Sequence, residues 1–285
     1  MRFSFILINY NNAQITIDCV NSILKAKKEN NDQLRIIIVD NNSNGRDREY
    51  LKNWEKEQYN INVLEVYYSD KNLGYFRAIN RGLELLSDED KQSYVIIGNN
   101  DLIYDIDFIK MLKLKKYNSD IFVVAPNIIN VNGLHQNPHV INRISKFREF
   151  YYTIYNTNYY MAILLEYIAS ALNLRSSKKD KFDYDSSRYI TMGFGACYIL
   201  LPAFFTHNKK LDDFLFLMGE EAMLAHQVIC SGGRTYYDAQ LKVLHIDNAT
   251  FKLIPSKTTY KFNQESYIAS KKYYKYSDII DEKIG

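Results

Sequence analysis

The sequence contains few cysteines, and their positions predict neither cross-links nor a metal site. Its three cysteines, Cys19, Cys197 and Cys230, are odd in number and far apart, so they do not form a disulfide framework. No Cys-x-x-Cys pair is present, which argues against a structural zinc site. A reducing compartment, the cytoplasm, is the simplest expectation for such a chain.

Long apolar runs and a strong charge are also missing. No stretch reaches the roughly 18 apolar residues of a membrane span. The apolar run at residues 3–8 is only as long as a strand and precedes no small-residue cleavage pattern, so we expect no signal peptide. A formal net charge of +3 is too weak for a nucleic-acid-binding protein. The 25 tyrosines stand out instead, because tyrosine suits sugar sites, interfaces and membrane edges.

Two common nucleotide-binding signatures are absent. Neither a Gly-x-Gly-x-x-Gly turn after the first apolar run nor a Gly-Lys-Ser/Thr loop occurs, which argues against a dinucleotide dehydrogenase and a P-loop protein. The chain instead alternates apolar strand patterns with helical patterns, the strands being expected at residues 3–8, 34–39, 61–67 and 94–97. This alternation predicts an α/β fold with a mostly parallel sheet flanked by helices. Asn- and Asp-rich loops follow three of the strands, on the edge where such sheets bind nucleotides.

The loops after these strands carry a series of short motifs. In the first half they are Ile8-Asn9-Tyr10-Asn11, Ile38-Val39-Asp40-Asn41-Asn42-Ser43, Asn72-Leu73-Gly74-Tyr75 with Asn80-Arg81-Gly82, and Gly98-Asn99-Asn100-Asp101. In the second half they are Gly193-Phe194-Gly195-Ala196-Cys197, Leu217-Met218-Gly219-Glu220-Glu221, Gly232-Gly233 and Leu244-His245. Each motif alone is loose, but their order and spacing together are fairly specific, and they resemble those of family 2 glycosyltransferases, which have the GT-A fold.

The resemblance implies a single GT-A (Rossmann-like) domain over residues 1–285, and a rhamnosyltransferase-like branch of the family is one placement. Residues 1–125 would form the nucleotide-sugar-binding half and residues 191–250 the acceptor and catalytic half. A helical, aromatic insertion would occupy residues 130–190, and a helical segment residues 251–285.

The donor site is expected at the strand ends of the first half. Asp40 is able to accept a base N–H and Tyr10 to cover the base face, and the resemblance makes them the uracil or thymine contacts. Tyr10 is alternatively a rim aromatic with no ligand. The other residues that the resemblance assigns to the donor are Asn11, Asn42, Asn72, Gly74, Asn80, Asn99 and Asn100.

Asp101 stands where the family places its acidic metal motif. Mg²⁺ or Mn²⁺ needs only one or two protein ligands, because phosphate oxygens and waters complete the octahedron. This chain has Asn99 and Asn100 where family members often have an acid, which implies a weaker site or one completed by the donor. His245 matches a metal-binding histidine of some members. The alternatives are an Asx turn at Asp101 and a structural role for His245.

Glu220 and Glu221 follow an apolar run and open a helical pattern. By resemblance they match the family's Glu-Asp motif, whose second acid is the general base, so Glu221 is the candidate base and Glu220 its neighbour. Glutamate is one methylene longer than aspartate, which leaves the position of the base open. The alternative is that both acids only favour the helix N-terminus. Asp212 or Asp213 would be the next candidate bases.

The insertion is rich in aromatic residues. Residues 150–174 are nearly all apolar or aromatic, and basic residues flank them. This pattern suits an interfacial membrane helix or a lipid-linked acceptor, while a buried helical hairpin or a homodimer interface is the alternative. Residues 260–276 alternate aromatics with lysines and predict a closing helix. The basic residues that flank the insertion are Lys146, Arg148, Arg175, Lys178, Lys179 and Lys181.

The expected function is therefore that of an inverting, metal-dependent glycosyltransferase. It would move a sugar from a UDP- or dTDP-sugar to a saccharide or lipid-linked saccharide, in bacterial surface polysaccharide synthesis, inside the cytoplasm or on the inner face of the plasma membrane. Two rival functions stay open. One is a sugar nucleotidyltransferase of similar fold, although its Gly-rich loop is not seen at residues 9–12. The other is a non-catalytic sugar-nucleotide-binding subunit.

Overall fold

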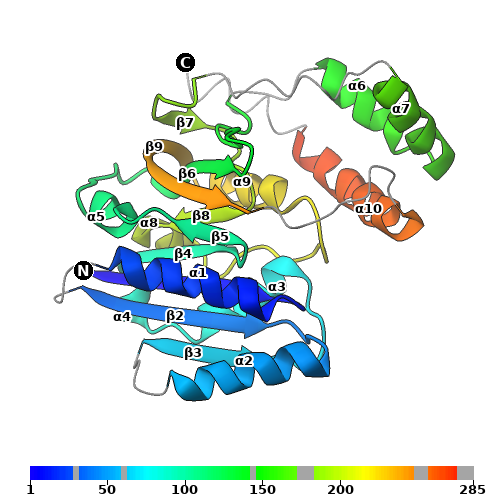
Figure 1. The fold of residues 1–285 in the computed structure, drawn as a ribbon. Coiled ribbons are helices and arrows are strands. Elements are labelled where there is room, and N and C mark those ends of the chain that lie inside the picture. Colours follow the sequence, from blue (N-terminus) through cyan, green and yellow to red (C-terminus); the bar gives the residue numbers. More distant parts are fainter. Residues whose placement is uncertain (28–31, 59–62, 142–145, 172–182, 247–255, 275–285) are drawn as a thin grey trace.

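The computed structural model describes residues 1–27, 32–58, 63–141, 146–171, 183–246 and 256–274. The strands among these residues form one sheet (Figure 1). The chain begins with β1 (Arg2–Asn9), α1 (Ala13–Ala26), β2 (Gln33–Asp40), α2 (Gly45–Glu57), β3 (Leu64–Tyr68), α3 (Tyr75–Glu84), α4 (Asp88–Lys91), β4 (Tyr94–Asn99) and β5 (Leu102–Tyr104). It continues with α5 (Phe108–Lys113), β6 (Ile121–Asn130), α6 (Lys146–Tyr155), α7 (Tyr159–Ala171), β7 (Arg188–Ile190), β8 (Cys197–Leu200), α8 (Pro202–His207), α9 (Glu220–Cys230), β9 (Arg234–His245) and α10 (Lys257–Tyr274).

The sheet is mixed and mostly parallel, as the sequence predicts. Its strand order is β3-β2-β1-β4-β8-β6-β9-β5, with β7 paired to β9 outside this path. Strands β3, β2, β1 and β4 are all parallel, and β6 is parallel to β9. Each antiparallel pairing between these strands involves β8 or β9. The expected strand at residues 61–67 is β3, which runs to Tyr68, while residues 61 and 62 lie outside the described part.

Both faces of the sheet are buried, which explains why the first strands are unbroken apolar runs. Phe5 and Leu7 of β1 point into the core that α1, α2 and α5 cover. The alternate residues Ile6 and Ile8 point into the core beneath α3, α8 and α9. Each fully buried side chain of this kind stabilises the fold by roughly 1.5–3 kcal/mol. The doubly covered strands therefore hold their loops at defined positions.

The register of the parallel strands brings their carboxyl ends to one edge. Asn9, the last residue of β1, lies opposite Asp40, the last residue of β2. Ile8 lies opposite Asn99, which ends β4. The loops that carry the predicted donor residues therefore start side by side, as expected for a ligand site in an α/β sheet.

The insertion forms two helices, α6 and α7, that contact each other, and α7 also contacts α10. In Figure 1 these three helices stand together beside the sheet. The helical hairpin is not buried in the core, because Phe147, Tyr160 and Tyr167 are 80%, 74% and 72% exposed. No helix among the described residues is long and apolar enough to cross a membrane. Residues 172–182 and 275–285 lie outside the described residues. They include four of the basic residues that flank the insertion, and Lys275.

Candidate functional site

The floor of the site is a hydrogen-bonded network between the ends of β1 and β2. The side-chain amide of Asn9 donates to Asp40 Oδ1 (2.9 Å), Ser43 Oγ (3.1 Å) and Asp47 Oδ2 (3.0 Å). Arg48 Nε donates to the other oxygen, Asp40 Oδ2, over 3.0 Å. The Asp40 side chain is completely buried. Asp40 thus lies beneath the site and holds its floor, and contact with a base stays a prediction for this residue.

Above this floor, the loop after β1 is tied to the loop after β2. Asn11 and Asn42 adopt left-handed backbone conformations, with φ of 58° and 64°, which asparagine tolerates better than most residues. The Asn11 side-chain oxygen accepts hydrogen bonds from the backbone and side-chain nitrogens of Asn44, both at 2.7 Å. Tyr10 beside them is 48% exposed. Its ring is therefore open to stack on a ligand.

The loop at residues 72–74 joins the two halves of the chain. Asn41 donates to Asn72 Oδ1 (3.0 Å) and to the Gly74 carbonyl (3.1 Å). Gly74 has φ of 82°, and a Cβ there would lie 2.1 Å from the Phe216 carbonyl oxygen. The next amide, of Tyr75, donates to that same carbonyl over 3.1 Å. Glycine at this position thus allows the donor half to meet the segment before α9.

Asn80, predicted to bind the donor, is engaged elsewhere. Its buried amide donates to the Leu211 carbonyl (2.8 Å) and to Asp213 Oδ2 (2.9 Å), and its oxygen accepts from the Leu211 amide (2.9 Å). All these partners belong to the segment between α8 and α9. In this geometry Asn80 holds that segment in place.

The strand end at residues 99–101 connects the floor to the second half of the chain. The Asn99 amide donates to the Ala196 carbonyl over 2.9 Å. The Asn100 side chain donates to Thr16 Oγ1 (2.8 Å), which itself donates to Asn9 Oδ1 (2.8 Å). Asn100 is therefore linked through one hydroxyl to Asn9.

Asp101 and His245, the two predicted metal ligands, lie together. The antiparallel pairing of β5 and β9 sets Leu102 opposite His245. This register brings Asp101 Oδ1 to 3.2 Å from His245 Nε2. The other ring nitrogen of His245, Nδ1, lies 2.8 Å from Gln136 Oε1. Asp101 Oδ1 is buried and accepts no hydrogen bond from the described residues.

This pair fits a divalent cation. A buried carboxylate oxygen without a hydrogen bond is costly unless a positive group faces it. An oxygen and an imidazole nitrogen are ligands that Mn²⁺ accepts, and the remaining positions would go to phosphate oxygens and water. Among the described residues no group of three or more His, Cys, Asp and Glu side chains is placed to hold a metal. The protein would thus supply two ligands.

Glu220 and Glu221 begin α9, as predicted. Glu220 is 8% exposed and accepts a hydrogen bond from the Met218 amide (2.9 Å). Burial and the neighbouring charge of Glu221 raise the pKa of Glu220 to about 7. Burial also raises the pKa of Glu221, whose Oε1 accepts from the Gly195 amide over 3.2 Å. Carboxylates with raised pKa values are suited to take up a proton near neutral pH.

The segment at residues 193–195 brings the acids and the metal pair into one site. A Cβ on Gly195 would lie 2.7 Å from Glu221 Oε1, so glycine permits this close approach. The ring of Phe194 next to it lies 6.0 Å from the ring of His245. The site thus combines groups able to accept a proton with a pair able to hold a cation.

Three residues of the site were not identified from the sequence. Gln136 contacts His245, Arg48 neutralises Asp40, and Thr16 bridges Asn9 and Asn100. None of them belongs to the motifs that carry the family resemblance. Arg48 alone had a local cue, because its α2 position follows the Asn-rich loop after β2.

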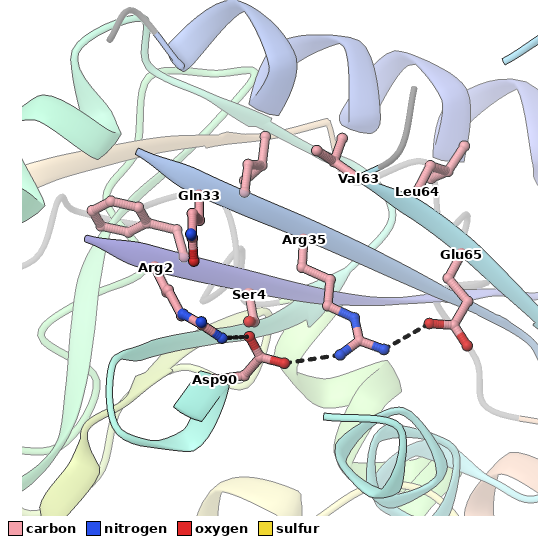
Figure 2. Close-up of a pocket in the computed structure, with 10 residues that line it drawn as sticks. Arg2, Ser4, Gln33, Arg35, Val63, Leu64, Glu65 and Asp90 are labelled. Atoms are coloured by element: carbon pink, nitrogen blue, oxygen red, sulfur yellow. Dashed lines mark hydrogen bonds and ion pairs between the residues drawn. The ribbon is translucent and has the colours of Figure 1, made fainter. Parts of the chain in front are cut away.

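A separate pocket lies at the opposite edge of the sheet, at the amino ends of β1, β2 and β3 (Figure 2). Its charged residues face one another. Arg35 contacts Asp90 and Glu65, each at 2.8 Å, and Arg2 lies 3.5 Å from Asp90. These ion pairs tie α4 to the strands. The pocket is therefore distinct from the site at the carboxyl edge.

Comparison with known structures identifies the fold. The structure of GalNAc-T7 with UDP, GalNAc and Mn²⁺ superposes with a TM-score of 0.61 at 14% identity, covering 95% of this chain and 47% of that one. The chain thus spans about half the length of GalNAc-T7. TarS 1–349 from S. aureus superposes with a TM-score of 0.55 at 12% identity, covering 95% and 71% of the two chains. Its complex with UDP-GlcNAc gives a TM-score of 0.56 at 14% identity, covering 89% and 60%.

These similarities confirm the GT-A fold predicted from the sequence. Among curated protein sequences, none matches this chain significantly. The sequence model of the family described as "Glycosyl transferase family 2" matches residues 4–177, more than half of the chain. The chain therefore belongs to glycosyl transferase family 2.

Proposed function

We propose that this protein transfers a sugar from a nucleotide-sugar donor to a hydroxyl acceptor with the help of a divalent cation. The observation that carries the proposal is the pairing of Asp101 Oδ1 and His245 Nε2 at 3.2 Å, on the edge where the donor loops meet. Family membership and the UDP, UDP-GlcNAc and Mn²⁺ bound by the GalNAc-T7 and TarS structures support it.

The donor would be a UDP- or dTDP-sugar. Its base would stack on the exposed ring of Tyr10, above the floor held by Asp40 and Asn9. Its ribose would lie near Asn99 and Asn100, whose amides are able to bond hydroxyl groups. Uracil and thymine present the same hydrogen-bonding edge, so both nucleotides satisfy this arrangement.

Asp101 and His245 would hold Mg²⁺ or Mn²⁺ against the donor diphosphate. When bound, the cation would stabilise the negative charge that develops on the departing diphosphate. The protein's own contribution is to present two ligands, the buried oxygen of Asp101 and the buried imidazole of His245. His245 is 5% exposed, which supports this role.

Glu221 would act as the general base of an inverting transfer. It would take the proton from the acceptor hydroxyl as that oxygen bonds to the anomeric carbon and the bond to the diphosphate breaks. Glu220 would be its supporting neighbour: the charge of Glu221 helps to raise the pKa of Glu220, while burial raises the pKa of Glu221. The Gly195 amide keeps the Glu221 carboxylate in one orientation.

The acceptor would be a saccharide of a bacterial surface polysaccharide, presented at an anionic lipid surface. Tyr160, Leu164, Tyr167 and Ile168 of α7 are spaced along one face of that helix, and all are exposed. The sequences of α6, α7 and α10 hold six Lys and Arg against three Glu. An exposed aromatic helix face, in helices whose sequences carry more basic than acidic residues, is the chemistry that binds an anionic membrane interface. The alternative to membrane binding is that the same face of α7 forms a homodimer interface.

A panel of nucleotide sugars tests the function. Release of free nucleoside diphosphate would be measured with and without Mn²⁺, and with and without a saccharide acceptor. A transferase releases diphosphate from one donor, faster with acceptor and with Mn²⁺. A nucleotidyltransferase instead releases pyrophosphate from a nucleoside triphosphate and a sugar phosphate. Binding of a donor without any turnover would indicate a non-catalytic subunit and overturn the proposal.

A further inference from the structure

The hydrogen bond between Gln136 and His245 determines which nitrogen of the imidazole is free. Gln136 Oε1 lies 2.8 Å from His245 Nδ1. A side-chain amide oxygen only accepts hydrogen bonds, so the proton of a neutral His245 is on Nδ1. The other nitrogen, Nε2, then carries a lone pair.

That nitrogen lies next to a second acceptor. Nε2 lies 3.2 Å from Asp101 Oδ1, and Asp101 Oδ1 accepts no hydrogen bond from the described residues. Two electron-rich atoms at this separation repel each other unless a cation joins them. In the opposite tautomer the proton on Nε2 would occupy the lone pair that a cation needs.

Gln136 is itself held firmly. Its backbone amide donates to the Ile128 carbonyl over 2.8 Å, and Ile129 of β6 pairs with His135. The neighbouring Asn137 donates its side-chain amide to the Pro126 carbonyl over 2.8 Å. Strand β6 is also the parallel neighbour of β9, which ends with His245. Both partners of the hydrogen bond are thus fixed to adjacent strands.

We propose that Gln136 is a positioning residue that keeps His245 in the Nδ1–H tautomer and so leaves Nε2 open for a divalent cation. The proposal rests on the metal-binding role proposed for His245. Such outer partners of a ligating histidine are commonly worth 10–100-fold in metal affinity. Loss of the Gln136 oxygen would remove the acceptor that keeps the proton on Nδ1, and a proton on Nε2 would leave that nitrogen without a lone pair for the cation.

The first experiment reads the tautomer in the metal-free protein. Proteins labelled with ¹⁵N-histidine are compared by long-range ¹H–¹⁵N spectra at about pH 8, above the usual histidine pKa. The His245 signals are assigned by their loss in His245→Asn. We expect protonated Nδ1 in the wild type and in Gln136→Glu, which keeps an acceptor oxygen, and a shift towards Nε2–H in Gln136→Leu. An unchanged tautomer in Gln136→Leu would overturn the proposal.

The second experiment measures Mn²⁺ binding by electron paramagnetic resonance. Gln136→Leu should bind Mn²⁺ about 10–100-fold more weakly than the wild type, and Gln136→Glu should restore binding. His135→Gln is the matched control, because His135 lies in the same segment and its side chain contacts Asn127 and Tyr184. Equal binding by Gln136→Leu and wild type would contradict the inference. Absence of Mn²⁺ binding by the wild type would instead refute the proposed metal site, while the tautomer comparison would still be readable.

Discussion

The backbone amide of Gly195 donates a hydrogen bond to Oε1 of Glu221 over 3.2 Å. The two residues are 26 positions apart, and the bond holds the first turn of α9 against the segment that also contacts His245. This contact orients one carboxylate oxygen and leaves the second one for other partners. A general base needs both a fixed position and a free oxygen.

Replacing Glu221 by glutamine should therefore abolish most of the transfer while leaving donor binding intact. The amide keeps an oxygen for the Gly195 bond but cannot take up a proton, and loss of a general base typically costs about 10²–10⁴ in rate. The measurement pairs a transfer assay with donor titration. Glu84→Gln, a change at an exposed carboxylate, is the control.

A well-folded Glu221→Gln with near-normal transfer would move the base to Asp212 or Asp213. If the acids only favour the helix N-terminus, both Glu220→Gln and Glu221→Gln should lose a few tenths of a kcal/mol in stability and keep their turnover.

The buried Glu220 should make stability fall as pH rises. Its pKa is about 7 in the folded protein against 4.5 as the ordinary value, so between these pH values the folded state binds more protons than the unfolded state. The free energy of unfolding then decreases with rising pH through this window, by up to roughly 3 kcal/mol. Urea unfolding of the metal-free protein at about pH 5 and about pH 8 measures the effect.

Glu220→Gln should flatten this difference, because the side chain no longer ionises. Part of the difference in stability should remain in this variant, because burial also raises the pKa of Glu221. A wild-type protein that gains stability between these pH values, or a Glu220→Gln variant with the full wild-type difference, would show that Glu220 is not the group responsible.

Replacing Asp40 should first lower the free energy of unfolding, because Asp40 holds the network between the ends of β1 and β2. Asp40→Ala leaves the Arg48 guanidinium and the Asn9 amide without their shared partner, and breaking a buried ion pair costs about 3 kcal/mol. We also expect weaker binding of free nucleoside diphosphate, even in the presence of a chelator, because the loops above this floor would loosen. Unfolding and UDP titration in EDTA give the two values. The exposed Asp88→Ala should change neither, and an Asp40→Ala protein of wild-type stability would contradict the network.

The aromatic face of α7 should bind anionic lipid. Wild-type protein should sediment with anionic vesicles and less so at high salt, because screening weakens the attraction. Replacing Tyr160, Leu164, Tyr167 and Ile168 by serine should abolish the binding. Leu114→Ser is the control, because Leu114 is 69% exposed but lies next to α5, outside these helices. A protein that ignores vesicles and dimerises through this face would support the competing interface.

The sheet could be predicted from the sequence where local pattern decides the structure. The segments that form β1, β2 and β4 are apolar on both faces. The sequences of α1 and α9 contain apolar residues at helical spacing. Asp101 and His245 were predicted as metal ligands from the motifs that contain them. The pairing of β5 with β9 is what brings the two residues together.

Contacts between distant segments could not be predicted in the same way. Gln136 reaches His245 across 109 residues through the pairing of β6 with β9, which no local pattern reveals. Asn80 was predicted to bind the donor because of the motif that contains it. Its side-chain amide instead donates a hydrogen bond to a segment 131 residues away. An amide side chain serves a ligand and a loop equally well, so sequence alone does not assign its partner.

The most direct test of the proposed metal site compares UDP binding by the wild type and by Asp101→Asn. Each protein is titrated by calorimetry with Mn²⁺ and with a chelator. Asp105→Asn, at an exposed acid four residues away, is the control. We predict that Mn²⁺ strengthens UDP binding by the wild type and by Asp105→Asn at least about tenfold, or ~1.4 kcal/mol. Asp101→Asn should bind UDP equally with and without Mn²⁺, at the level of the wild type in chelator. An Asp101→Asn protein that keeps the full Mn²⁺ effect would contradict the proposed metal site and the function built on it.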